Sequence, residues 1–145
     1  MCTLDFNSLQ PLLNLIKEID KWNQLTKKNM TKCEVNLSAN LANNFIGSYY
    51  SGSCQNSNYN IEIWLGYWCK HGYTISFYIE DNSFQNKLQT CLINNYGSCL
   101  IDKDIMRKLP WYSIQLPSAI SSDSLDVKIA SAEAKNIINN VLNII

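Results

Sequence analysis

The sequence predicts an α+β fold in which a small antiparallel sheet, built on a central β-hairpin, packs against long N- and C-terminal helices. Two patterns carry this prediction: apolar residues recur at helical spacing near both ends of the chain, and they alternate along the chain between positions 61 and 79. A chain of 145 residues fits one ordinary domain and is long enough to bury about 68–70% of its unfolded surface. We therefore expect a single α+β domain over residues 1–145.

The composition argues against several kinds of partner. The formal net charge is zero and Arg107 is the only arginine, so the chain has little with which to concentrate or read nucleic acid. No apolar run is long enough to span a membrane. The first residues, MCTLDFNSLQ, lack the basic stretch and apolar run of a secretory signal, so we expect a cytoplasmic protein with reduced cysteines. With no CxxC pair and a single histidine, we expect no structural zinc and no cofactor.

The two terminal helices follow from apolar spacing and from capping residues. Asn7 or Ser8 can cap a helix that we expect to run to about residue 26. The last helix is expected from about Ser122 to Ile145, with Asp126 near its positive end. The apolar positions that define the two helices are Leu9, Leu12, Leu13, Ile16 and Ile19, and then Val127, Ala130, Ala134, Ile137, Ile138 and Val141.

Two further helices and one further strand are expected between the ends. The segment SANLANNFIGSYY, residues 38–50, has large apolar side chains four apart and predicts a helix that stops near Gly52. Asn82 or Ser83 can cap another helix, which ends before Gly97. Residues 98–110 fit either a short strand or a short helix, and residues 111–116, WYSIQL, predict a strand.

The stretch IEIWLGYWCKHGYTISFY, residues 61–78, predicts the central hairpin. Alternation places two apolar sets on one face: Ile61, Ile63, Leu65, Tyr67 and Cys69 from the first strand, and Tyr73, Ile75, Phe77 and Ile79 from the second. A three-residue loop of Lys70, His71 and Gly72 aligns the two sets, pairs Cys69 with Tyr73 and gives Gly72 a left-handed conformation. His71 is then a turn residue with no catalytic neighbour.

The opposite face of this hairpin is the predicted functional surface. The predicted register sets Trp64 across from Tyr78, and leaves a shallow notch at Gly66 between Trp64 and Trp68. Tryptophan and tyrosine bury much area yet keep a polar edge, which is why protein interfaces favour them. We considered three interpretations: a face covered by one of the chain's own helices, an exposed protein-binding face, and a slot for a small ligand.

The same register sets Glu62 opposite Glu80, with Asp81 adjacent, and like charges opposed on a sheet are destabilising. A lysine or Arg107, solvent screening, a divalent cation or a shared proton could offset the repulsion. The pair Asp126 and Lys128 has the form of a metal-dependent nuclease motif, but its place in a predicted helix favours a surface role.

We therefore expect a non-catalytic protein-binding module, with no catalytic and no metal-binding residues. Its partner-binding residues are Trp64, Trp68, Tyr78, Glu62 and Glu80. The module is expected to be an inhibitor, an immunity or counter-defence protein, or a chaperone, by analogy with small proteins of mixed α+β build. The same face could instead form a homodimer. The alternative is a metal-dependent hydrolase or nuclease that uses Glu62, Glu80 and Asp81, with Asp126 and Lys128.

Overall fold

The computed structural model describes residues 6–22, 31–34, 45–53, 60–68, 71–79, 82–100, 111–119 and 125–144. In these residues one antiparallel sheet has its strands in chain order, β1-β2-β3-β4-β5. The strands are β1 (Thr31–Glu34), β2 (Phe45–Ser53), β3 (Asn60–Trp68), β4 (Gly72–Ile79) and β5 (Trp111–Gln115). The helices are α1 (Phe6–Lys21), α4 (Asn82–Tyr96) and α6 (Val127–Leu142), with short 3-10 turns η1 (Gly97–Cys99) and η2 (Pro117–Ala119). The predicted α+β class is confirmed.

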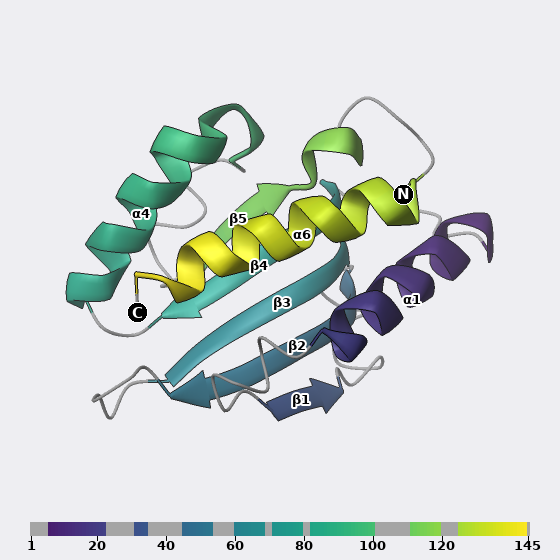
Figure 1. Ribbon diagram of the computed structural model, residues 1–145, viewed down its shortest axis with the longest axis horizontal. Helices are drawn as coiled ribbons and strands as arrows, with labels where there is room; N and C mark the ends of the chain where they lie inside the picture. Colours follow the sequence, from purple (N-terminus) through teal and green to yellow (C-terminus); the bar gives the residue numbers. More distant parts are fainter. Residues whose placement is uncertain are drawn as a thin grey trace.

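The helices lie together on one face of the sheet (Figure 1). α1 and α6 pack side by side across it, and α4 packs beside α6 near β4 (Figure 1). Tyr96 of α4 joins the two helices because its hydroxyl accepts a hydrogen bond from Asn140 Nδ2 at 2.6 Å. Of the helices described, none combines the length and the apolar composition needed to cross a membrane.

The predicted apolar face of the hairpin forms the centre of the core. Every side chain of this set that the structure describes, apart from the half-buried Tyr67, is at most 5% exposed. Burial of each isoleucine or leucine contributes about 1.5–3 kcal/mol. The buried apolar residues of the sheet are Tyr50, Ile61, Ile63, Leu65, Tyr73, Ile75, Phe77, Ile79 and Ile114, and those of the helices are Leu12, Leu15, Ile16, Ile19, Leu88, Leu92, Ala130, Ala134, Ile137, Ile138, Val141 and Leu142.

The three predicted helices that are present differ from expectation only at their ends. α6 begins at Val127 rather than near Ser122, because Asp126 has an extended backbone and its Oδ1 accepts a hydrogen bond from the Ile129 amide at 3.2 Å. α1 ends at Lys21, and α4 ends directly before Gly97 as predicted. The predicted strand at 111–116 is β5, and Leu100 forms one antiparallel bridge with Ile114 of that strand. The segment 101–110 lies outside the described residues.

The helix predicted over residues 38–50 is wrong where the structure describes it, because residues from Phe45 onward form β2. Residues 38–44 lie outside the described part. Gly47 lies opposite Gly66 of β3, and a Cβ at Gly47 would come within 2.2 Å of the Leu65 carbonyl oxygen. The strands therefore need glycine at this close approach, and pairing with β3 outweighs the apolar spacing that suggested a helix.

The hairpin register differs from the predicted one by two residues. Trp64 lies opposite Ser76 rather than Tyr78, and Glu62 lies opposite Tyr78 rather than Glu80. Alternation repeats every two residues, so both registers place the same side chains on the same face. The observed register pairs Ile61 with Ile79, where the predicted one would have set Ile61 across from Asp81. Gly72 has the predicted left-handed conformation, with φ +75°. It pairs with Trp68 and therefore begins β4, whereas it was predicted to lie in the loop.

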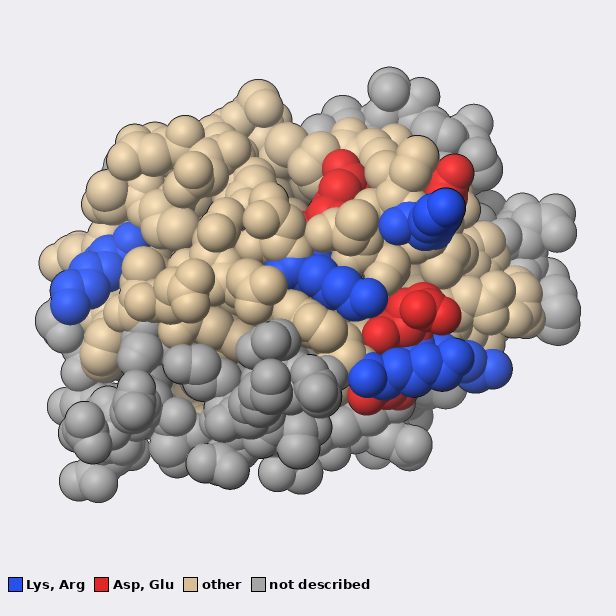
Figure 2. Space-filling view, in the orientation of Figure 1, with Lys and Arg blue, Asp and Glu red and all other residues tan. Residues whose placement is uncertain are grey.

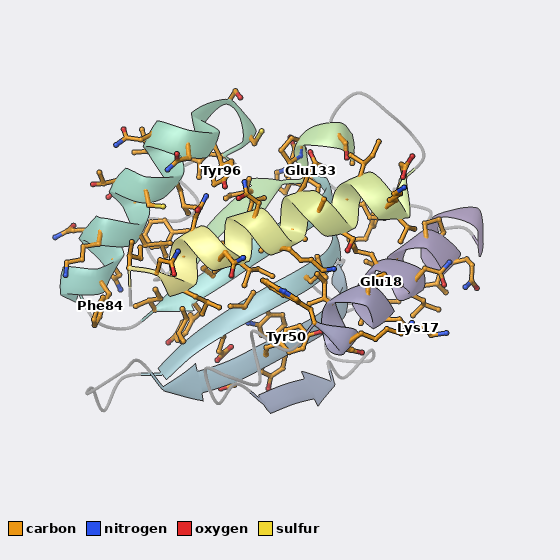
Figure 3. All side chains as sticks on the ribbon, in the orientation of Figure 1. Lys17, Glu18, Tyr50, Phe84, Tyr96 and Glu133 are labelled. Carbon is orange, nitrogen blue, oxygen red and sulfur yellow. The ribbon has the colours of Figure 1, made fainter. Side chains whose placement is uncertain are left out.

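One part-buried hydrogen bond ties α1 to the sheet. The Tyr50 hydroxyl of β2 donates to Asp20 Oδ1 at 2.5 Å, and Tyr50 lies beside the C-terminal end of α1 (Figure 3). Tyr50 is only 3% exposed. Burial, then the hydrogen bond to Asp20 and its charge, raise the pKa of the Tyr50 phenol far above its ordinary value of about 10.

Gly47→Ala should lower the free energy of unfolding by about 3 kcal/mol or more, since the added Cβ meets the backbone of β3 rather than a flexible side chain. Urea denaturation of the wild type and the variant measures the difference. Gly97→Ala is the matched control, because a Cβ there meets nothing within 4 Å and should change stability by no more than about 0.5 kcal/mol. Equal stability of the Gly47 variant would contradict the close approach of β2 and β3.

Tyr50→Phe should lower the free energy of unfolding at pH 8 by about 1 kcal/mol, through loss of the hydrogen bond to Asp20. The unfolded chain releases the Tyr50 proton near pH 10, whereas the folded chain keeps it above that pH. The stability linked to this group is therefore complete below about pH 10 and falls by about 1.4 kcal/mol per pH unit above it. Denaturation under reducing conditions at pH 8 and pH 11 should show the two proteins converging by about 1 kcal/mol. A constant difference would contradict the buried phenol.

Candidate protein-binding face of the sheet

The face of the sheet that points away from α1 and α6 is called the outer face below. It lies behind the ribbon as Figure 1 is drawn, and none of the three described helices covers it. The strand pairing brings the following residues onto it: Tyr49 and Ser51 of β2, Glu62, Trp64 and Gly66 of β3, Thr74, Ser76 and Tyr78 of β4, and Ser113 and Gln115 of β5.

A stacked aromatic pair dominates the β2–β3 side of the outer face. Tyr49 lies directly opposite Trp64, with ring centroids 4.3 Å apart and ring planes 10° from parallel. Both side chains are half-buried. Such a pair is worth about 0.5–1.5 kcal/mol beyond the area that it buries, so each ring holds the other in place.

Tyr49 is a site residue that sequence reasoning missed, because its segment was interpreted as a helix. Two signals in FIGSYYSGS, residues 45–53, favour a strand instead. The glycines at 47 and 52 are unfavourable inside a helix. The adjacent tyrosines are typical of a strand that presents one ring to each face, and Tyr50 does point into the core.

Glu62 is fixed beside the aromatic pair. Its Oε1 accepts a hydrogen bond from the Trp64 indole Nε1 at 2.9 Å, and the side chain is half-buried. Its cross-strand neighbours are Ser51 and Tyr78, so the predicted opposition to Glu80 does not occur. In the described part of the chain Glu62 forms no salt bridge; the ion pair found there joins Lys21 to Glu18 on α1.

The centre of the outer face consists of small, buried residues. Gly66, Thr74 and Ser76 are buried, and Ser76 Oγ lies 2.6 Å from Ser113 Oγ in a buried hydrogen bond. Among the described residues the fully buried Thr74 hydroxyl has no hydrogen-bond partner, an arrangement that typically costs about 1–3 kcal/mol. The pairing on which the predicted notch rested is wrong, because Gly66 faces Gly47 and Thr74 instead of Ser76. The notch itself stays a prediction, since the Trp68 side chain lies outside the described residues.

The remaining predicted partner-binding residues are placed only in part. Tyr78 is half-buried on the outer face, opposite Glu62. Trp68 ends β3 opposite Gly72, and its side chain lies outside the described residues. Glu80 and its neighbour Asp81 lie entirely outside them.

The alternative catalytic residues do not converge where the structure describes them. Asp126 caps α6 and Lys128 lies exposed in its first turn, on the helix side of the sheet, whereas Glu62 lies on the outer face. Asp126 therefore has the helix-surface role that its position predicted. Within the described ranges, no three His, Cys, Asp or Glu side chains gather to hold a metal ion. His71 lies in the hairpin turn, where its carbonyl accepts a hydrogen bond from Gln115 Nε2 at 2.7 Å.

Comparison of the chain with protein-family models, with curated proteins and with solved structures gives no match.

The stacked pair predicts an energetic coupling between Tyr49 and Trp64. In a double-mutant cycle with Tyr49→Ala and Trp64→Ala, the double variant should lose about 0.5–1.5 kcal/mol less unfolding free energy than the sum of the single variants. The control cycle pairs Tyr49→Ala with Ile129→Ala, an exposed residue of α6, and should be additive. A coupling near zero for Tyr49 and Trp64 would show that the rings do not stack in solution.

Proposed function

We propose that this protein binds another protein through the outer face of its sheet and acts as a non-catalytic inhibitor, an immunity or counter-defence protein, or a chaperone. The observation that carries the proposal is the Tyr49–Trp64 stack with Glu62 bonded to the indole. It joins apolar area, a fixed ring geometry and a polar group in one place.

The stack suits protein recognition because its two rings are already held in place before a partner binds. Binding costs the free energy of immobilising rotamer-rich side chains, about 0.5–1.5 kcal/mol each. Trp64 is already held by a ring contact and by a hydrogen bond to Glu62, so little of that cost remains. Tryptophan and tyrosine are also the residues that most often dominate interface energetics.

The described helix side of the molecule offers a weaker basis for recognition. Its charged side chains are few and scattered, Lys21 Nζ lies 3.9 Å from Glu18 Oε1, and no large single-sign patch is seen among the described residues of this side (Figure 2). Large exposed apolar side chains on the described helices are scattered single residues, namely Leu13, Ile93 and Ile129. The outer face is therefore the better candidate for binding a protein. The described helix side has no large basic patch that would attract nucleic acid.

A cytoplasmic location belongs to the same proposal. Cys91 and Cys99 are free thiols, half-buried and buried respectively. Free cysteines of this kind pack as small hydrophobic residues and persist where thiols stay reduced.

Trp64→Ala should abolish partner capture while it lowers the thermal midpoint by only a few degrees, since the side chain is half-buried. The immobilised wild type and variant are exposed to lysate of the native host, the captured protein is identified by mass spectrometry, and its affinity is then measured in purified form. We expect a loss of at least about 30-fold. Ile129→Ala removes exposed apolar area from the helix side and should bind as the wild type does. Undiminished binding by the Trp64 variant, or a loss of stability typical of a core residue, would refute the proposal.

A further inference from the structure

We propose that the partner presents an arginine or lysine side chain to Glu62, so that the outer face reads a positive charge beside an aromatic stack. This inference rests on the proposed function and names the chemistry of the partner. Three features of the outer face lead to it.

Within the five described strands, Glu62 is an isolated charge on the outer face. Among the outer-face positions of the five described strands it is the only ionisable acid or base of the Asp, Glu, Lys and Arg types. The described part of the chain gives it the Trp64 indole as a hydrogen-bond donor but no cation. An indole N–H satisfies one lone pair of the carboxylate and leaves the net charge in place.

The surroundings of Glu62 match a cationic side chain. The Tyr49–Trp64 stack lies next to the carboxylate, and aromatic faces attract cations. A guanidinium is planar and can pair with a carboxylate while it lies against a ring. Because Glu62 is held in place by the indole, the carboxylate need not be ordered when the partner arrives.

Other occupants of this face are disfavoured by the same charge. A neutral apolar partner would bury the Glu62 carboxylate without compensation, which is costly, and an acidic partner would be repelled. A two-fold homodimer through the outer face would bring a second copy of a surface that has no cation at the described strand positions. A different protein with an exposed arginine or lysine remains the best match.

The test titrates the full chain with three short capped peptides: Gly-Arg-Gly, the same peptide with citrulline in place of arginine, and Gly-Glu-Gly. Citrulline keeps the shape of arginine and lacks its charge. The readout is the NMR signal of the Trp64 indole N–H, assigned from its absence in Trp64→Phe. The arginine peptide should shift this signal saturably, and the citrulline and glutamate peptides should bind at least about tenfold more weakly.

Glu62→Gln is the decisive variant, because its amide oxygen can still accept the hydrogen bond from Trp64 while the charge is gone. It should lower the affinity for the arginine peptide about tenfold or more. Glu18→Gln removes the same charge from α1 on the opposite side of the sheet and should bind as the wild type does.

Equal binding of citrulline and arginine, unchanged binding by Glu62→Gln, or no movement of the Trp64 signal with any peptide would overturn the inference. A Trp64 signal that shifts with protein concentration alone would also overturn it, in favour of a second copy of the chain. The proposed function is judged separately by capture with Trp64→Ala. A partner that is lost with Trp64→Ala but retained with Glu62→Gln would leave protein binding intact and reject the cationic contact.

Discussion

The close approach of β2 and β3 at Gly47 and Gly66 is the constraint on which the rest of the sheet depends. A side chain at Gly47 would collide with the backbone of β3 at Leu65 and Gly66, so the two strands fit together only with glycine at position 47. This pairing sets the register of both strands and thereby decides which side chains leave the sheet on each side. Tyr49 then meets Trp64 on the outer face, and Tyr50, one residue later, enters the core and reaches Asp20 of α1.

The two faces of the sheet differ in how they are stabilised. The helix side is a continuous apolar core, in which the side chains of β3 and β4 meet α1, α4 and α6. The middle of the outer face instead contains small polar residues, among them a buried pair of serines and a threonine whose hydroxyl has no hydrogen-bond partner in the described part of the chain. That arrangement contributes less to stability than an apolar layer of the same area. The aromatic pair and Glu62 lie to one side of it, where the side chains keep partial access to solvent.

Much of this fold could be predicted from the sequence, because hydrophobic periodicity determines which face a residue occupies. Helical spacing identified α1, α4 and α6, and alternation identified every core residue of the hairpin that the structure describes. Periodicity of two cannot separate registers that differ by two residues, so the predicted neighbours of Glu62 and Trp64 were wrong although their face was right. In β2 the spacing of Leu37, Leu41, Phe45 and Tyr49 imitated a helix, and Tyr49 was missed for that reason. Only the long-range pairing with β3 decides between helix and strand for this segment. The local spacing of apolar residues carries no information about that pairing.

The order of the strands has a consequence for how the chain folds. In the described sheet every strand pairs with its neighbour in sequence, so β1 to β4 can assemble with only a short stretch of chain to close at each step, whereas β5 joins after the longer connection that contains α4. The contact between α1 and α6 is different, since it joins residues 6–21 to residues 127–142. During synthesis α1 can pack against β2 and β3 before α6 has been made, whereas full burial of its apolar stripe needs α6. α6 therefore completes the core only after the strands on which it packs have been made.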